Sequence, residues 1–354
     1  MAHEITESDG MMYHGTTPWH GIGTSVPSLC TPYQAVHAAG MAWDVEPAPM
    51  QYVLPAEEVP PVVPGYLPVT AEPQAVPIDD RVMLIRSDTK APLGIVSNQY
   101  QIMQNLELAE FVLDVIGDNS AAVETAGCFR GGRRVWFLLN QGAHDVAGVD
   151  TVGKFSLFAQ GHDGTLAVRV LPTSVRVVCA NTFAASGAGG SEGLSIPHRG
   201  DMAASVDAAR HVLAGTMEMH DTFIEAAEHL ASESISDGWL SHFFERAYIE
   251  AVASPSARRL LKDGRLSSLP PDEREQAERA AGKMGTTIGA WKRNFDGRDG
   301  GGLAPSIAGT RWHAFNSVTQ WCDHARPSRA DRMESNLLGA CSDVKRGVMA
   351  AAMA

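Results

Sequence analysis

Two consecutive stretches decide the fold, AAVETAGCFRGGRRVWFLLNQG at residues 121–142 and KFSLFAQGHDGTLAVRVLPTSVRVV at residues 154–178. Each holds two runs of β-branched, aromatic and other apolar residues on either side of a glycine-containing turn, which is the pattern of a β-hairpin. The first turn is RGGRR at residues 130–134, and the second is GHDG at residues 161–164. We therefore expect four consecutive strands in this part of the chain.

The residues just before these stretches predict a further hairpin and one helix. RVMLIRS at residues 81–87 and the short apolar run at residues 95–96 are separated by turn residues, which favours two paired strands. NLELAEFVLDVIGD at residues 105–118 has apolar residues at mostly helical spacing and predicts an amphipathic helix. The expected order is thus β-β-α-β-β-β-β. The fold class is α+β, an antiparallel sheet with a packed helix in the N-terminal half.

The character of the sequence changes after residue 182. A Gly/Ser-rich connector is expected at residues 183–200, and helical periodicity dominates residues 201–354. Helices are predicted at residues 203–231, 237–253, 254–262, 271–283, 286–294, 306–324 and 329–351. We expect the C-terminal half to be mostly helical.

Residues 1–80 differ from the rest in two ways. They contain ten acidic residues and no Lys or Arg, and many prolines lie between residues 46 and 78, including VLPAEEVPPVVPGYLP. Proline removes a backbone donor and blocks helix interiors, so we expect an extended loop or linker here. This predicts four regions: an acidic Pro-rich segment (1–80), a β-rich core domain (81–182), the connector (183–200) and a helical region (201–354).

The net charge of −13 is unevenly distributed. Ten of the negative charges belong to residues 1–80, whereas residues 125–200 hold seven basic and four acidic residues. A locally positive surface is therefore compatible with an acidic protein, and net charge does not exclude a nucleic-acid partner.

The RGGRR turn is the strongest candidate for such a surface. Arginines on a tight turn project donors whose fork geometry matches phosphate oxygens, and basic residues on nearby strands would extend the surface. The bland interpretation is that turns are simply polar and exposed. The candidate phosphate contacts are Arg130, Arg133, Arg134, Lys154, Arg169 and Arg176, and the candidate base-stacking residues are Phe129, Trp136 and Phe158.

Other classes of function have little support in the sequence. No apolar run is long enough to span a membrane, and the N-terminus lacks the pattern of a signal peptide, so we expect a cytoplasmic protein. The five cysteines are scattered and are expected to be buried thiols. No paired carboxylates, phosphate loop, catalytic triad or metal-ligand spacing stands out, which leans against an enzyme and predicts neither cofactor nor metal.

Three blocks carry a resemblance to a known family. They are WHGIGT at residues 19–24, HDG at 162–164 together with VRVVCANT at 175–182, and WHAFNSVTQWCDH at 312–324. The chain resembles the phage- and plasmid-encoded proteins grouped as domain of unknown function 932. The resemblance implies a protein of the host cytoplasm encoded on a mobile element, among replication and recombination genes. The predicted layout is also similar to that of RecT-type and eukaryotic single-strand annealing proteins, which form rings or filaments on DNA.

Two hypotheses follow from these observations. The first is a non-enzymatic, self-assembling protein that binds and anneals single-stranded DNA. The second is a non-catalytic oligomeric interaction protein that binds a host factor through its acidic or helical surfaces.

Overall fold

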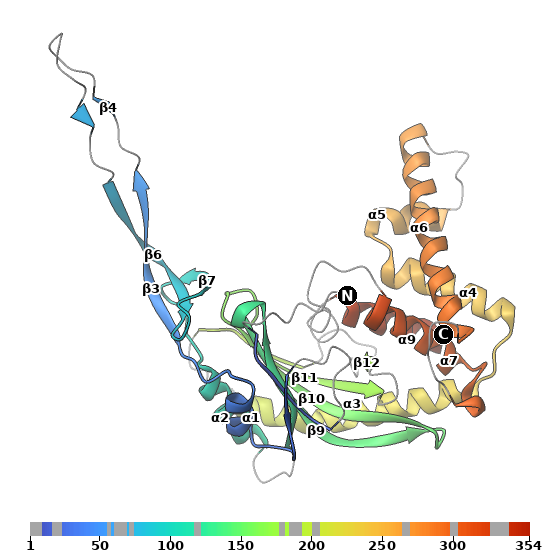
Figure 1. Ribbon diagram of the computed structural model, residues 1–354. Helices are drawn as coiled ribbons and strands as arrows, with labels where there is room; N and C mark the ends of the chain where they lie inside the picture. The colour runs from blue at the N-terminus through green and yellow to red at the C-terminus, as the bar shows by residue number, and fades with distance from the viewer. Residues whose placement is uncertain are drawn as a thin grey trace.

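The computed structural model describes residues 9–15, 23–54, 58–59, 69–70, 74–116, 122–176, 181–183, 193–199, 206–263, 270–297, 304–325 and 340–354. Their fold is α+β (Figure 1). A body formed by one large β-sheet and three helices carries a β-arm, and the C-terminal half is mostly helical. This confirms the fold class expected from the sequence.

The described residues form a large sheet of eight strands. Its order is β12-β11-β10-β9-β8-β1-β2, with β13 also paired to β11, and all pairs are antiparallel except β1 with β2. The strands are β1 (Met11–His14), β2 (Thr24–Val26), β8 (Ala122–Phe129), β9 (Arg134–Val146), β10 (Asp150–Gly161), β11 (Val168–Arg176), β12 (Asn181–Phe183) and β13 (Leu194–Ile196). The two expected hairpins are therefore present as β8–β9 and β10–β11.

Three helices cover one face of this sheet. They are α1 (Pro32–Ala38), α2 (Asn105–Ile116) and α3 (Val206–Ser232). α2 buries Leu108 and Val112 in the same core as Phe137 and Phe158, which point to one face because they are paired directly opposite each other on β9 and β10. The predicted helix after residue 105 is confirmed, and it packs where the apolar spacing placed its buried side.

A second, three-stranded sheet forms the base of the arm. It consists of β3 (Val45–Leu54), β6 (Gln74–Arg86) and β7 (Pro92–Ser97), in the order β3-β6-β7, and β4 (Glu58–Val59) pairs with β5 (Val69–Thr70) farther out. The hairpin predicted from residues 81–96 is confirmed as β6–β7.

The prediction of a proline-rich linker at residues 46–78 is wrong for its described part, because most of these residues belong to paired strands. Pro47 pairs with Leu84, Pro49 with Val82, and Pro77 with Gln51. β3 is an edge strand, and the outer part of β6 has no neighbour but β3, so each proline ring sits where a strand has a free edge.

The expected boundary at residue 80 is not a structural boundary. It falls inside β6, and residues before it complete the body: β1 pairs with β8, and α1 packs on α2. α1 begins at a capping box, in which the Thr31 hydroxyl accepts from the Gln34 N–H and the Gln34 side chain accepts from the Thr31 N–H. The acidic segment is thus part of the body and the arm.

The C-terminal half is helical, as expected. Beyond α3 it contains α4 (Asp237–Ala247), the π-helical turn η3 (Tyr248–Val252), α5 (Pro255–Asp263), α6 (Pro271–Phe295), the 3-10 turn η5 (Pro305–Ile307), α7 (Arg311–Gln320), the π-helical turn η6 (Trp321–Ala325) and α9 (Ala340–Met353). Residues 203–205 and 326–339, where parts of two helices were expected, lie outside the described residues.

The predicted break between residues 283 and 286 does not occur, since α6 is one continuous helix. Glycine in a helix interior costs about 1 kcal/mol relative to alanine, and Gly285 lies near the expected break. The helix continues because Ala277 and Ala280 are buried before that point and Trp291 is fully buried after it.

Two buried polar contacts tie the helical half together and to the sheet. The Trp312 indole N–H donates to Asp150 Oδ2 at 2.7 Å, which joins α7 to β10. The Lys345 ammonium of α9 donates to the Asp323 carboxylate of η6, and both side chains are buried. These contacts fix α7, η6 and α9 around the hydrophobic core of the helical half, which includes Trp291 and Trp312 and is separate from the core between the sheet and α2.

Candidate nucleic-acid interface

The turn between β8 and β9 has an unusual backbone. Arg130, Gly131 and Gly132 have φ angles of +56°, +72° and +97°. Glycine adopts such angles at little cost, but for a non-glycine residue the left-handed region costs roughly 1 to 2 kcal/mol. Contacts from the rest of the protein must therefore hold Arg130 in place.

Those contacts come from two segments far away in the sequence. Asp9 accepts the N–H of Gly131 at 2.5 Å, and the Arg86 guanidinium donates to the Gly131 carbonyl at 3.2 Å. Arg86 is itself fixed, because it lies over the Trp43 ring at 4.4 Å from the centroid and makes two hydrogen bonds to Asp88, at 3.0 and 2.7 Å. The turn is thus clamped at both backbone polar groups of Gly131, its N–H and its carbonyl.

Gly132 completes the clamp by allowing close approach. A Cβ at this position would lie 2.7 Å from Cζ2 of Trp43, which is shorter than side-chain contacts permit. The backbone of the turn therefore sits directly on the Trp43 ring, and only glycine fits there.

The clamped turn presents two exposed arginines, Arg130 and Arg133. The Arg133 carbonyl accepts the backbone N–H of His162 at 2.7 Å, which links the first turn to the HDG turn. The Arg133 backbone is thereby fixed while its guanidinium faces solvent.

Arg134, the next residue, is less exposed than Arg130 and Arg133. Its Nη2 donates to Thr165 Oγ1 at 3.0 Å, and its Nε lies 4.0 Å from Asp163 Oδ2. Burial lowers the pKa of Arg134 and the Asp163 carboxylate opposes that effect, so the guanidinium keeps its charge. Asp163 is the central residue of the HDG motif and Thr165 follows it directly, and neither was predicted as a site residue.

A buried polar cluster supports the HDG turn from behind. His162 is fully buried, and its Nε2 lies 2.9 Å from Asn105 Oδ1, while Asn105 donates to the Met41 carbonyl at 2.9 Å. Burial lowers the pKa of His162 to about 3, so this ring is neutral at physiological pH. The Tyr100 hydroxyl donates to the Gly161 carbonyl at 2.7 Å on the same turn. His162 therefore has a positioning role in the structure.

Arg169 lies on the same outer face of the sheet as Arg134. Arg134 pairs with Gly161, and Arg169 pairs with Ala159 two residues earlier on the same strand. Positions two apart share a face, so the two arginines flank β10 on one side. The Nε of Arg169 is buried and makes no hydrogen bond in the described structure.

Lys154 does not join this surface. It lies on the opposite face, beneath α3, where its ammonium donates to Asp221 at 2.7 Å. Arg176 ends β11 and its side chain lies outside the described part of the structure.

The three rings predicted to stack on bases are core residues. Phe129, Trp136 and Phe158 are between 0% and 1% exposed. Phe129 and Trp136 stack on each other with centroids 5.7 Å apart, and Phe158 packs edge-on against Phe111 of α2. They have no exposed surface to offer to a base, and among the described residues no aromatic platform accompanies the arginines of the site.

Sequence reasoning found the arginines of the site but missed the residues that hold them. Asp9 and Arg86 lie 122 and 45 residues from Gly131, so no local spacing signals their contact. Asp163 stands within the HDG block that carried the family resemblance, and this was the one available signal for it.

The comparisons with known proteins identify the family. The sequence profile described as domain of unknown function (DUF932) matches residues 92–340, more than two thirds of the chain. The protein therefore belongs to the DUF932 family. No curated protein and no solved structure matches the chain. The matched region includes β7 to α7 and with them the whole RGGRR turn, whereas Asp9 and Arg86 lie before it.

Two further observations concern the described residues alone. No described helix is long and apolar enough to cross a membrane. No group of three described His, Cys, Asp or Glu side chains is arranged to hold a metal ion.

Proposed function

We propose that the protein binds single-stranded DNA through a guanidinium surface made of Arg130, Arg133, Arg134 and Arg169, and that it does so as an oligomer. The observation that carries the proposal is the clamped turn, which holds two exposed arginines on a backbone fixed from both sides. The mobile-element setting implied by the family resemblance extends the proposal to strand annealing in recombination or replication.

The clamp supports binding because it reduces the cost of ordering the site. A flexible arginine-bearing loop loses conformational entropy when it binds a ligand, whereas a turn already fixed by Asp9 and Arg86 loses less. Holding Arg130 at a positive φ also has an energetic cost, and such strain is typically retained where a side chain must point in a set direction.

The residue types in the site determine which part of the DNA it recognises. Guanidinium groups pair with phosphate oxygens in any sequence, and the described part of the site offers no exposed aromatic ring that would stack on a base. We therefore expect binding that depends on salt and not on sequence.

The test is the binding of a fluorescently labelled DNA oligonucleotide, followed by anisotropy over a salt series from about 50 to 200 mM. Arg133→Ala should weaken binding about tenfold at low salt, equivalent to about 1.4 kcal/mol, and should reduce the slope of log K against log salt by about 0.7. The loss should be the same for oligonucleotides of different sequence.

Lys154→Ala is the matched control. It removes the same charge from the same sheet, but Lys154 lies on the opposite face and is bound to Asp221. We expect its DNA affinity to stay within about twofold of wild type, which is less than 0.5 kcal/mol. Absence of binding at the lowest salt, or equal losses for the two variants, contradicts the proposal. Tighter binding of a matched RNA would overturn the choice of DNA.

A further inference from the structure

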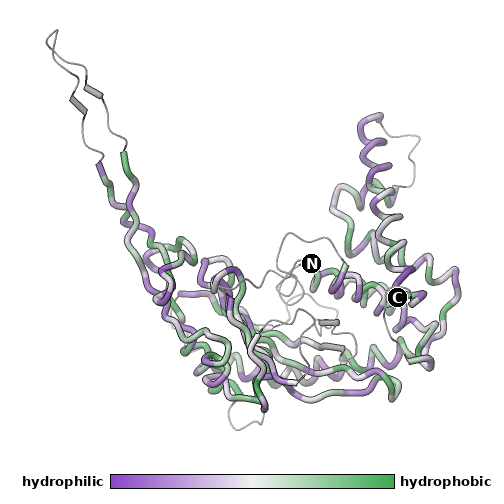
Figure 2. Tube along the Cα trace, in the orientation of Figure 1, coloured by the Kyte–Doolittle hydropathy of each residue, from purple (hydrophilic) through white to green (hydrophobic). Residues whose placement is uncertain are grey.

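The arm exposes apolar side chains far from the body. Beyond the end of β7, β3 and β6 form a two-stranded ribbon (Figure 1), and the far end of β3 is hydrophobic (Figure 2). Tyr52, Val53 and Leu54 are 51%, 59% and 44% exposed. An isolated ribbon is marginally stable in water, and exposed apolar groups of this size mark interaction surfaces. A partner that covers these side chains would stabilise the arm.

The arm is also acidic. The pairing of β3 with β6 jumps from Pro49 with Val82 to Met50 with Ile78, so residues 79–81 have no partner on β3. Asp79 and Asp80 are exposed at this break, where Asp80 Oδ2 lies 3.5 Å from Nε of the exposed Arg81, so the three residues carry one net negative charge. No Lys or Arg precedes Arg81 in the sequence. Any surface that accepts the arm must then combine apolar and positive groups.

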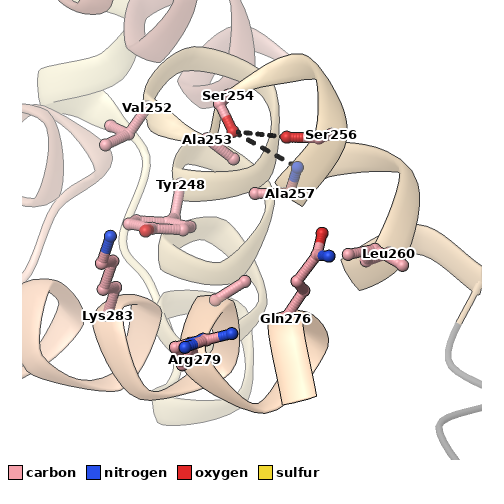
Figure 3. Close-up of a pocket in the computed structure, with 11 residues that line it drawn as sticks. Tyr248, Val252, Ala253, Ser254, Ser256, Ala257, Leu260, Gln276, Arg279 and Lys283 are labelled. Carbon is pink, nitrogen blue, oxygen red and sulfur yellow. Dashed lines mark hydrogen bonds between the residues drawn. The ribbon is translucent and has the colours of Figure 1, made fainter. Parts of the chain in front are cut away.

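Such a surface exists at the opposite end of the molecule, between η3, α5 and α6. A groove of about 380 Å³ opens there, within the range of about 300 to 1,000 Å³ that is typical of ligand sites. Tyr248 and Leu260, which are 6% and 5% exposed, form its floor beside the half-buried Val252, and Arg279 and Lys283 supply positive charge. In Figure 3 the Tyr248 ring lies between these cations of α6 and the residues of η3 and α5.

The cations of the groove are available to a partner. Arg279 contacts Glu275 one turn earlier at 3.2 Å, but the two side chains are 64% and 66% exposed. An exposed pair of this kind contributes little to stability, so Arg279 can exchange Glu275 for another carboxylate. Lys283 is exposed on the same side of α6.

We propose that the arm of one copy of this chain docks into the groove of a second copy, with the apolar end of β3 against Tyr248, Val252 and Leu260, and the acidic residues near Arg279 and Lys283. The arm and the groove are different surfaces at opposite ends of the chain (Figure 1), so the contact is heterologous and each docked copy leaves one arm and one groove open. Pro47 and Pro49 interrupt the donors of the β3 edge, which disfavours edge-to-edge pairing of two arms.

This inference rests on the self-association contained in the proposed function, and it is tested without DNA, so that its failure leaves the DNA-binding proposal standing. Light scattering coupled to size exclusion measures the mass over a series of protein concentrations. Wild type should exceed the monomer mass of 37.8 kDa as concentration rises. The arm variant Tyr52→Ser with Leu54→Ser, and the groove variant Arg279→Glu with Lys283→Glu, should each remain monomeric.

Mixing the two variants gives the decisive result. The arm variant keeps an intact groove and the groove variant keeps an intact arm, so the mixture should form a species of twice the monomer mass and nothing larger. The control is Lys262→Glu with Lys292→Glu, which makes the same charge change on exposed residues of α5 and α6 outside the groove and should assemble like wild type.

Three outcomes overturn the proposal. The first is a wild-type protein that stays monomeric at every concentration. The second is assembly that survives both the arm and the groove variants. The third is a mixture of the two variants that stays monomeric although it contains an intact arm and an intact groove. An arm that docks on another arm would instead let the groove variant assemble by itself, which equally contradicts the proposal.

Discussion

Lys345→Met should destabilise the helical half strongly, because it leaves a buried carboxylate without its cation. Lys345 and Asp323 are 1% and 3% exposed, and the ammonium donates directly to the carboxylate. Removing one partner of such a pair costs about 3 to 5 kcal/mol. Domains have a free energy of unfolding of about 5 to 15 kcal/mol, so this is a large part of the total.

The measurement is urea unfolding followed by tryptophan fluorescence. With a slope of about 3 kcal/mol per molar urea, the midpoint of Lys345→Met should fall by roughly 1 to 1.7 M. The double variant Lys345→Met with Asp323→Leu removes both charges and should regain most of the loss, because the remaining side chains no longer need solvation. A single variant that loses less than about 1 kcal/mol, or a double variant less stable than the single one, would refute the reasoning.

Two further predictions concern the sheet and its turns. Gly132→Ala should lower the free energy of unfolding in urea by about 2 to 4 kcal/mol, because it combines a positive φ with a Cβ 2.7 Å from Trp43. The control Gly148→Ala has a positive φ but nothing within 4 Å of its Cβ, and should lose about 1 to 2 kcal/mol. Equal losses in the two variants would contradict the close approach of Gly132 to Trp43. Burial lowers the pKa of His220 to about 4, so acid favours the unfolded state between the unfolded value of about 6.5 and pH 4. At pH 5 the neutral His220 should lower the free energy of unfolding by about 2 kcal/mol relative to neutral pH. His220→Gln should remove this difference between the two pH values. A variant whose pH profile matches that of wild type would contradict the prediction.

Local patterns were sufficient for most of the secondary structure. The hairpins around residues 130–134 and 161–164 and the helix after residue 105 were predictable, because alternation, helical spacing and turn glycines act within a few residues. The proline-rich segment was predicted wrongly because the sequence does not show which strand edges are free. Once β3 is an edge strand, Pro47 and Pro49 are compatible with pairing.

The candidate site was predictable only as a set of residue types. The exposed arginines of a glycine turn follow from the sequence, and the structure places Arg130 and Arg133 on that turn. The grouping of Lys154 with them failed, because its partner Asp221 belongs to a helix that begins 52 residues later. Trp136 was misjudged because an aromatic residue on a strand has the same local pattern whether its face is covered or open.

By itself the sequence determined the α+β fold class, the order of strands around the RGGRR turn, the helical C-terminal half and the separation of acidic from basic segments. These properties depend on short-range spacing and composition. Only the tertiary structure decided which arginines share a face, which rings are buried, and that Asp9 and Arg86 clamp Gly131 from 122 and 45 residues away. It also placed the arm and the cationic groove at opposite ends of the folded molecule. Such contacts are decided when distant elements pack against one another, and no local pattern encodes the partner.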